Sequence, residues 1–373
     1  MTANSSYAAA GVDTAAGDLA VELMKEAVAK THGPNVLGGV GGFAGLFDLS
    51  FTKAYVRPLL ATSTDGVGTK IAIAQALDVH DTIGQDLVGM VVDDIVVVGA
   101  KPLFMTDYIA CGKVVPDRIA AIVTGIARAC AETGTALVGG ETAEHPGLMG
   151  VDDYDVAGAA VGVVEADRLL GAERVADGDA VLAIGSSGLH SNGFSLVRHI
   201  LRNAGLSYTD AAPDLGTTWG EALLEPTRLY SGPLVKLLEH DRLGTSVHSL
   251  SHVTGGGIAA NLARVLPRGS RVEVDRSTWS PAPVFRVLND LAGTTLESTE
   301  GTWNLGIGFF AVVAPDAAAD VIAELGALGL PAWQAGTVTI GGAPAPTGSA
   351  DGWEQGAKGV DGGAVRLVGS YAS

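Results

Sequence analysis

Apolar and polar residues follow two periods along the chain, and these periods predict helices and strands. Between residues 116 and 133 apolar side chains recur at helical spacing, and Gly134 follows where many helices end. Short apolar runs such as 156–165 are typical of buried strands. The same reasoning predicts further helices at 18–31, 81–95, 194–205, 221–238 (interrupted at Pro226) and 282–291, and further strands at 53–61, 103–110, 136–144, 180–185 and 304–314.

Composition supports an α/β fold (of the α+β type) and indicates two domains. Hydrophobic residues make up 47% of the chain but aromatic residues only 5%, as in compact α/β proteins filled with aliphatic side chains. A chain of 373 residues is long enough for about two domains. Because a polar segment follows the strand predicted at 156–165, we expect an N-terminal domain at 1–168, a C-terminal domain at 169–345 and an irregular tail at 346–373.

Charge and cysteine content exclude several classes of protein. The chain has 23 basic and 41 acidic residues, a formal net charge of −18, whereas a protein that coats nucleic acid needs a basic face. No apolar run reaches the about 20 residues that span a membrane, because Asp93 and Asp94 interrupt the run at 90–100. The N-terminus lacks the features of a signal peptide, and Cys111 and Cys130 form no metal-type pair. We therefore expect a cytoplasmic protein without nucleic-acid or membrane partners.

One segment, TSTDGVGTK (62–70), combines groups that suit phosphate chemistry. Its last six residues hold a carboxylate, two glycines, a hydroxyl and an ammonium group, which belong to Asp65, Gly66, Gly68, Thr69 and Lys70. The carboxylate can hold Mg²⁺, the lysine can neutralise phosphate oxygens, and the glycines let backbone approach a bulky anion. The simpler alternative is a strand–turn–helix connection with an incidental charge pair.

Beyond its first residue, Asp81, the helix predicted at 81–95 carries three further carboxylates. Asp86 and Asp93 are seven residues apart and share a helical face, and Asp94 follows directly. Charged groups beside the neighbouring valines are costly to bury without a partner. A bound cation explains these residues, and so does an exposed helix edge.

Two glycine-rich segments of the first half are candidates for contact with a nucleotide. Five glycines lie within the eight residues 38–45, which form either a flap over a nucleotide or a flexible connection. In ALVGGETAE (136–144) paired glycines follow a predicted strand and precede two carboxylates.

The second half contains two further segments in which glycines precede a helix. In SSGLHSNGFSLVR (186–198), Gly188 and Gly193 flank a histidine, a serine and an asparagine. The first backbone amides of the helix that follows can bind an anion. In HVTGGGIAANLARVLP (252–267) three successive glycines open a helix that Pro267 ends.

The order of these segments resembles that of phosphoribosylformylglycinamidine cyclo-ligases, the AIR synthetases of purine biosynthesis. The order is TSTDGVGTK, DLVGMVVDDIVVVGAKPLF, ALVGGETAE, SSGLHSNGFSLVR, HVTGGGIAANLARVLP and NLGIGF. The resemblance runs from about Tyr7 to about Gly341, and six motifs in register make it specific. The chain departs from the family at Asp93, where Asn is usual, and at His145, where Met is common.

The resemblance implies a fold, a reaction and cofactors. The implied N-terminal sheet pairs with that of a second copy into a barrel, giving a homodimer, and the C-terminal domain is a mixed sheet flanked by helices. The implied reaction converts formylglycinamidine ribonucleotide (FGAM) and ATP into 5-aminoimidazole ribonucleotide (AIR), ADP and phosphate through a phosphorylated amide. ATP would lie in a cleft between domain surfaces together with Mg²⁺, and K⁺ is an additional candidate cofactor.

The motifs and the resemblance together assign roles to individual residues. The catalytic candidates are Asp65, Lys70, Asp94 and His190; Asp65 and Asp94 are the expected Mg²⁺ ligands, with Asp93 and Glu141 as alternatives. The nucleotide-binding candidates are Gly41, Gly42, Gly66, Gly68, Thr69, Gly139, Gly140, Glu141 and Thr142. The substrate-binding candidates are Ser187, Ser191, Asn192 and His252.

Two histidines have alternative roles. His190 can take a proton from the attacking nitrogen, since imidazole titrates near neutral pH, or it can bind the ribose or phosphate of the substrate together with Asn192. His252 can contact phosphate or only cap the turn before the triple glycine.

Two other functions compete with the cyclo-ligase. The first is a sister ATP-dependent enzyme, such as selenophosphate synthetase or thiamine-monophosphate kinase. Selenophosphate synthetases carry a reactive Cys or selenocysteine in the N-terminal glycine loop, and here no Cys precedes Cys111. The second is a nucleotide-binding regulatory module without turnover, which the intact acidic and lysine positions disfavour.

Overall fold

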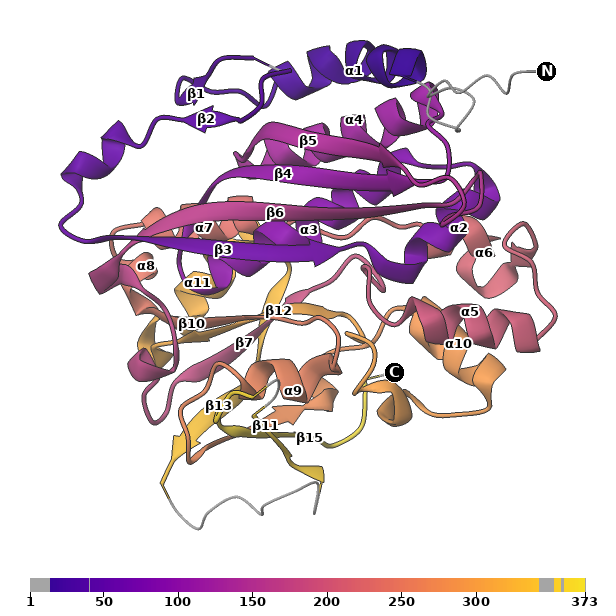
Figure 1. Ribbon diagram of the computed structural model, residues 1–373. Helices are drawn as coiled ribbons and strands as arrows, with labels where there is room; N and C mark the ends of the chain where they lie inside the picture. Colours follow the sequence, from indigo (N-terminus) through magenta and orange to yellow (C-terminus); the bar gives the residue numbers. More distant parts are fainter. Residues whose placement is uncertain (1–13, 40, 342–351, 357–358, 373) are drawn as a thin grey trace, which may run out of the picture. The chain divides into compact units, whose positions relative to one another are not determined.

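The computed structural model describes residues 14–39, 41–341, 352–356 and 359–372. Contacts between Cα atoms divide the chain into two compact units, whose elements are drawn in Figure 1. The first unit contains Met1–Ile95 and Lys101–Ala166, and the second contains Val96–Ala100 and Asp167–Ser373. Each unit is built on its own sheet.

The first unit has a four-stranded sheet in the order β3-β6-β4-β5. Its strands are β3 (Pro58–Gly66), β4 (Lys101–Cys111), β5 (Ala136–Glu144) and β6 (Tyr154–Glu165). Strand β6 runs antiparallel to β3 and β4, whereas β4 and β5 are parallel. Because parallel strands need a crossover connection, the helix α4 (Pro116–Thr133) joins β4 to β5. Figure 1 shows the four strands side by side.

One face of this sheet is buried beneath helices, and α3 (Asp81–Val97) packs closely on it. A Cβ atom on Gly162 would lie 2.3 Å from Cγ2 of Ile95, so only glycine allows this approach of β6 to α3. In β4, Met105 and Ile109 are fully buried on the same side. Tyr108, which lies between them in the sequence, points to the opposite face of the sheet and is exposed.

The opposite face of the sheet carries exposed side chains. Tyr108 of β4 is 43% exposed and Leu60 of β3 is 64% exposed. The strand register places both residues on this face, because residues opposite each other in paired strands point to the same side. This open face has apolar groups that a second sheet can cover.

The remaining elements of the first unit lie before and after β3 in sequence. Helix α1 (Thr14–Ala29) packs against α4. A short hairpin of β1 (Val36–Leu37) and β2 (Leu46–Phe47) follows, and α2 (Ile71–Leu77) follows β3.

The second unit has a seven-stranded mixed sheet in the order β10-β12-β7-β13-β11-β15-β14. Most pairs are antiparallel, and β11 and β15 are parallel. The strands are β7 (Ala180–Gly185), β10 (Val247–His252), β11 (Ser270–Asp275), β12 (Ile307–Val313), β13 (Ala332–Ile340), β14 (Glu354–Gln355) and β15 (Ala364–Val368), and a separate small hairpin pairs β8 (Ala211–Ala212) with β9 (Thr217–Thr218).

Helices flank the sheet of the second unit, as the resemblance implied. They are α5 (Phe194–Asn203), α6 (Trp219–Leu223), α7 (Ser231–Glu239), α8 (Leu243–Ser246), α9 (Gly257–Ala263), α10 (Pro283–Ala292) and α11 (Ala318–Ala327). Aliphatic side chains of α7 and α11, such as Leu234 and Val321, pack in one core with residues of β7 and β12, such as Leu182 and Ala311. This core includes residues of β7, which leads directly into the glycine-containing segment 186–198.

One predicted strand needs correction, and one predicted break in a helix is confirmed. The strand expected at 53–61 is β3 at Pro58–Gly66, so the first half of TSTDGVGTK lies inside a strand. The helix expected at 221–238 is broken into α6 and α7, as Pro226 predicted.

The tail at 346–373 was expected to be irregular, but it contains β14 and β15. The AVRLV run of β15 adds to the free edge of β11, where backbone groups lacked partners from the rest of the sheet. Residues 346–351 of this tail lie outside the described residues.

None of the helices in the described part of the chain combines the length and apolarity that crossing a bilayer requires.

Candidate functional site

The segment 62–70 connects β3 to α2 through a tight turn. Asp65 lies half-buried near the end of β3, and its Oδ1 accepts a hydrogen bond from the backbone N–H of Gly66 at 2.8 Å. Gly68 has φ +75°, a left-handed conformation that favours glycine. The chain then makes one 3₁₀ turn, Gly68–Lys70, before α2 begins. The carboxylate thus lies within the last residues of β3, whereas the sequence predicted that the strand would end at residue 61, before Asp65.

Lys70 is buried and paired with a carboxylate of α3. Its Nζ lies 2.8 Å from Oδ1 and 2.8 Å from Oδ2 of Asp86, and both side chains are 0% exposed. The sequence led us to expect the Lys70 ammonium to face phosphate, but in this structure protein encloses it. Burial is tolerated because each charge neutralises the other. Sequence analysis assigned Asp86 either a bound cation or an exposed helix edge, but in the structure this carboxylate is buried and its cation is Lys70, 16 residues away.

The other acidic residues of α3 differ sharply in exposure. Asp93 is fully buried, whereas its neighbour Asp94 is exposed. Asp86 and Asp93 therefore share a buried face, as their spacing predicted, and Asp94 lies on another side of the helix. Among the described residues no group of three or more His, Cys, Asp or Glu side chains is arranged to hold a metal ion.

Gly139, Gly140, Glu141 and Thr142 all lie on β5, next to β4. Gly139, Gly140 and Glu141 are exposed. A Cβ atom on Gly140 would lie 1.6 Å from Oδ1 of Asp107 in β4, so a side chain cannot replace this hydrogen. Sequence analysis missed Asp107. Burial raises the pKa of the Asp107 carboxyl from its ordinary value to about 7.

The described glycines of the segment 38–45, from which residue 40 is excluded, lie between β1 and β2 in the sequence. Gly41 has φ +105°, and a Cβ atom there or on Gly42 would meet no atom closer than 3.7 Å. By contrast, a Cβ on Gly45 would lie 2.5 Å from the carbonyl oxygen of Val138 in β5. The base of the hairpin is therefore fixed against β5, while Gly41 and Gly42 are open to solvent.

In the second unit, residues 186–193 form a compact loop between β7 and α5. His190 is 1% exposed and has φ +60°, which is uncommon for a residue other than glycine. Its Nε2 accepts a hydrogen bond from the backbone N–H of Ser187 at 3.3 Å. The Ser187 hydroxyl donates to the carbonyl oxygen of Pro226 at 2.7 Å. His190 therefore contributes to the conformation of this loop.

Four rings form a row behind the loop. The ring centroids of His190 and Tyr230 are 5.9 Å apart, those of Tyr230 and Phe309 are 4.8 Å apart, and those of Phe309 and His252 are 4.8 Å apart. The His252 and Phe309 rings stack with an interplanar angle of 21°. The row links the two histidines that the sequence singled out.

The triple-glycine loop after His252 meets the loop that carries Asn192. A Cβ atom on Gly255 would lie 3.5 Å from Oδ1 of Asn192. Ser191 is buried, and its Oγ has no hydrogen-bond partner in the described structure. The four substrate-binding candidates of the sequence therefore lie in one region of the second unit.

Two residues that sequence analysis did not assign support these loops. Asn304 donates through Nδ2 to the carbonyl oxygen of Gly188 at 2.9 Å, and Trp303 donates through Nε1 to that of Gly193 at 3.4 Å. Both precede β12, and Asn304 begins the NLGIGF motif. The motif was the available signal, but its role became visible only in three dimensions.

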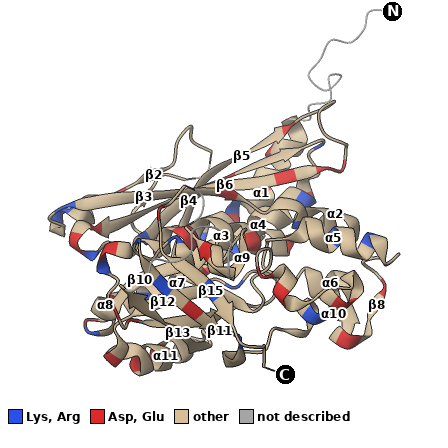
Figure 2. Ribbon diagram, turned by 90° about the horizontal axis from the view of Figure 1, so that it is seen from below, with Lys and Arg blue, Asp and Glu red and all other residues tan. Residues whose placement is uncertain are grey.

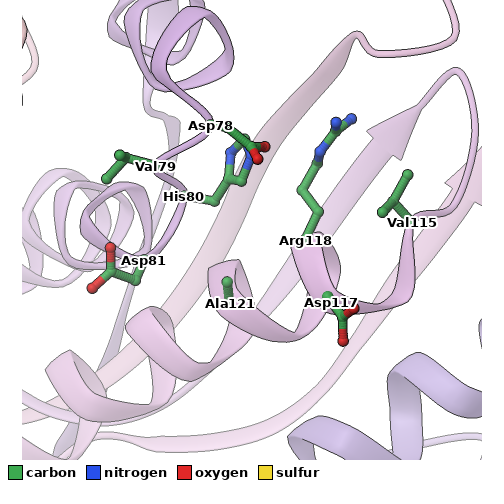
Figure 3. Close-up of a pocket in the computed structure, with 8 residues that line it drawn as sticks. All are labelled: Asp78, Val79, His80, Asp81, Val115, Asp117, Arg118 and Ala121. Carbon is green, nitrogen blue, oxygen red and sulfur yellow. The ribbon is translucent and has the colours of Figure 1, made fainter.

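The first unit also contains a surface cavity of about 620 Å³. Figure 3 shows Asp78 and His80 lying together in it, with Arg118 beside them. His80 hydrogen-bonds through Nε2 to Asp78 at 2.9 Å and through Nδ1 to the Tyr154 hydroxyl at 2.9 Å. Arg118 donates to the carbonyl oxygen of Asp152 at 3.2 Å. Asp78, His80 and Arg118 therefore each hydrogen-bond to a neighbouring protein group at this cavity.

Charged residues of both signs are distributed over the described ribbon. In the view of Figure 2, Lys and Arg positions are interspersed with the more numerous Asp and Glu positions.

Comparison with known proteins places the chain in the class of AIR-synthase-related proteins. The model of the AIR synthase related protein N-terminal domain matches residues 52–164, and that of the C-terminal domain matches residues 176–347. A solved thiamine-monophosphate kinase from Stenotrophomonas maltophilia K279a has a TM-score of 0.64 at 20% identity, covering 94% of this chain and 96% of that one. The hydrogenase maturation protein HypE, solved in complex with ATP, has a TM-score of 0.59 at 20% identity, covering 88% of this chain and 87% of that one. At this identity the two structures show a shared fold.

A curated relative narrows the class to a family. The phosphoribosylformylglycinamidine cyclo-ligase of Geobacillus kaustophilus (strain HTA426) is 49% identical over 336 residues, which cover 90% of this chain and 96% of the relative. This chain belongs to the phosphoribosylformylglycinamidine cyclo-ligase family.

Proposed function

We propose that the protein is an ATP-dependent cyclo-ligase that converts FGAM to AIR, with release of ADP and phosphate, in purine biosynthesis. The observation that carries this proposal is the 49% identity to a named cyclo-ligase across 96% of that relative. The meeting of the Asn192 loop with the triple-glycine loop supports it, because these loops come from the two motifs that suggested the substrate.

The reaction needs positioning and charge stabilisation more than a protein nucleophile. The amide oxygen of FGAM attacks the γ-phosphorus of ATP, and ADP leaves. The neighbouring nitrogen then attacks the carbon of the phosphorylated amide, the C–O bond breaks, and phosphate leaves with the former amide oxygen. The attacking nitrogen loses a proton as the ring closes. Holding the two reacting groups together supplies much of the rate.

We propose that the first unit binds ATP. Asp65 and Asp94 are the proposed Mg²⁺ ligands; Mg²⁺ binds through one or two carboxylates together with phosphates and waters, so a cage of three protein ligands is not required. Bound Mg²⁺ would neutralise charge on the phosphates. The proposed nucleotide contacts remain Gly41, Gly42, Gly66, Gly68, Thr69, Gly139, Gly140, Glu141 and Thr142.

The burial of Lys70 supports a revised role for this residue. We propose that Lys70 acts through Asp86, by fixing the start of α2 against α3 beside Asp65, and does not contact phosphate itself.

We propose that the second unit binds the ribose phosphate of FGAM through Ser187, Ser191, Asn192 and His252. The buried ring of His190, whose Nε2 accepts from the loop backbone, supports a binding and positioning role over acid–base catalysis. The stacking of His252 on Phe309 fixes the plane of that ring, which supports a binding role in one defined orientation.

We further propose a cytoplasmic homodimer with domains at 1–168 and 169–345. The exposed Leu60 and Tyr108 on the open face of the first unit's sheet support pairing with a second copy, which the family resemblance implies. The division between the units after Ala166 supports the domain boundary. K⁺ dependence is an additional expectation from the family.

An ADP-release assay tests the proposed function. With FGAM, ATP, Mg²⁺ and K⁺, we expect ADP and the imidazole product in equal amounts. Absence of both products contradicts the proposal. Because a solved thiamine-monophosphate kinase shares the fold, thiamine monophosphate serves as the control substrate, and we expect no ADP from it.

A further inference from the structure

In the second unit, the side chains of Arg276 and Tyr371 form a partly buried polar network with the carboxylate of Glu300. Arg276 donates to its carboxylate through Nε at 2.6 Å and through Nη2 at 2.9 Å. The hydroxyl of Tyr371 donates to the same carboxylate at 2.5 Å. The Arg276 and Glu300 side chains are each only 14% exposed. Bidentate, charge-assisted bonds of this kind fix geometry strongly.

The backbone of Glu300 touches the triple-glycine loop directly. Its carbonyl oxygen accepts a hydrogen bond from the N–H of Ile258 at 3.1 Å. A Cβ atom on Gly257 would lie 1.7 Å from the same oxygen. Gly256 and Gly257 have φ +106° and +74°. Glycine adopts positive and negative φ about equally readily, so these residues do not fix the loop conformation by themselves. The loop therefore depends on an outside contact to hold one conformation.

The segment that follows Glu300 reaches the second loop of the same site. Trp303 and Asn304 hydrogen-bond to the carbonyl oxygens of Gly193 and Gly188. A displacement of Glu300 would therefore disturb hydrogen bonds to both the triple-glycine loop and the loop at 186–193.

Tyr371 belongs to a segment that is fixed at several points. Strand β15 pairs with β11, and the N–H of Ala372 donates to the carbonyl oxygen of Trp279 at 3.2 Å. Arg286 donates to the carbonyl oxygen of Ala372 at 2.7 Å. The ring of Tyr371 packs edge-on against Trp279 at 5.2 Å. The C-terminal domain model of the family ends at residue 347, so this segment lies outside the family match.

We propose that Tyr371 is a positioning residue for the substrate site: through Glu300 it holds the triple-glycine loop in the conformation that binds the ribose phosphate of FGAM. This inference rests on the proposed function of the second unit and extends it to a segment that the family match does not include. Tyr371 does not touch the substrate; it acts through the Glu300 carboxylate and the Ile258 amide.

The variant Tyr371→Phe tests the proposal, because it removes the hydroxyl and retains the ring against Trp279. We expect the KM for FGAM to rise about tenfold, which corresponds to the loss of one hydrogen bond to a charged group, while kcat changes less than about twofold. We expect the amide hydrogen of Ile258 to exchange faster by a similar factor. In Glu300→Gln we expect the same two effects, and adding Tyr371→Phe to it should give less than the product of the single effects.

Tyr208→Phe is the matched control, since Tyr208 is a half-buried tyrosine of the same unit outside this network. We expect wild-type KM and wild-type Ile258 exchange in this control. An unchanged KM and unchanged exchange in Tyr371→Phe would overturn the proposal, as would equal changes in the control.

The exchange measurement separates this inference from the proposed function. If the wild-type protein produced no AIR, the proposed function would fail, and faster Ile258 exchange in Tyr371→Phe would still support the contact through Glu300. If the wild-type protein produced AIR but the variant differed in neither measurement, only the positioning role would fail.

Discussion

Lys70 and Asp86 form an ion pair in the interior of the first unit, with Nζ 2.8 Å from each carboxylate oxygen and both side chains fully buried. The pair joins the turn after β3 to the middle of α3, two segments that the sequence gives no reason to connect. The pair places two opposite charges inside a core of aliphatic residues. The stability of the first unit should therefore depend on keeping both partners or removing both.

Replacing Lys70 alone should be strongly destabilising. In Lys70→Met the Asp86 carboxylate loses its cation, and we expect the free energy of unfolding to fall by about 3–5 kcal/mol in denaturant titrations. The double variant Lys70→Met/Asp86→Leu should be more stable than Lys70→Met. The control Lys25→Met removes an exposed pair with Glu22 on α1 and should cost less than about 1 kcal/mol. A loss in Lys70→Met as small as in this control would refute the argument.

Asp107 should make stability fall as pH rises. Burial raises the pKa of this carboxyl from 3.8 to about 7, so the folded state keeps the proton over a range in which the unfolded chain releases it. Its contribution is therefore fully present below pH 3.8 and is lost as pH rises through about 7. Asp107→Asn cannot ionise, and the free-energy difference between variant and wild type should grow in favour of the variant by up to about 1.4 kcal/mol per pH unit between pH 4 and 7.

Denaturant titrations of both proteins at several pH values in this range measure the difference. A difference that stays constant with pH would contradict the predicted ionisation of Asp107.

Loss of either proposed Mg²⁺ ligand should abolish most turnover. In Asp65→Asn or Asp94→Asn we expect kcat for ADP release to fall by about 100-fold or more, because the phosphates lose charge stabilisation. Dimer formation, measured by size-exclusion chromatography with light scattering, should persist. Asp290→Asn, at an exposed aspartate of α10, is the matched control and should keep wild-type turnover. Near-normal kcat in both variants would remove the metal assignment.

His190→Asn separates the two roles of this histidine. Asparagine tolerates φ +60°, so the variant removes the imidazole with little backbone strain. For a binding and positioning role we expect the KM for FGAM to rise about tenfold while the pH profile of kcat keeps its shape. Loss of one limb of that profile at unchanged KM would instead establish acid–base catalysis.

Gly308 allows Tyr230 to lie in the row of rings. A Cβ atom at this position would lie 1.8 Å from the Tyr230 hydroxyl oxygen and 2.8 Å from Cε1 of His190. The Tyr230 hydroxyl donates to the carbonyl oxygen of Gly185 at 2.9 Å, so the ring cannot move without losing this bond. Gly308→Ala should cost about 1–3 kcal/mol of stability and raise the KM for FGAM. Gly301→Ala, which would meet no atom within 4 Å, should leave both unchanged.

Local sequence patterns predicted the elements well where one face of an element is buried. The helix at 116–133 and the strand at 156–165 agree closely with α4 and β6, because their apolar periods are long and end at clear signals. The strand predicted at 53–61 lies further along the chain, at Pro58–Gly66. Exposed and half-buried residues alternate as far as Asp65, as they do in a strand, but the chemistry of the motif favoured a loop there. Strand β15 was missed because its pairing partner is far away in sequence.

The candidate site could be predicted as a set of residues but not as an arrangement. The motifs named Asp65, His190 and Asn192, and the structure shows what surrounds each. Partners such as Asp86 and Asn304 could not be predicted, because a buried carboxylate or amide is chosen by the tertiary neighbourhood and not by the adjacent sequence. Burial also decides protonation, which is why Asp107 has no signature in the sequence.

The pairing of β15 with β11 has a consequence for folding. Arg366 of β15 bonds to Glu273 of β11 across 93 residues of chain, so closing this loop is entropically costly and the pair should form late in refolding. Among the described residues, the strand outside β15 at this edge of the sheet is β14, which has two residues, so this edge should be the first part of the second unit to open. Each opening would release Tyr371, and mild denaturant should therefore weaken substrate affinity before the unit as a whole unfolds.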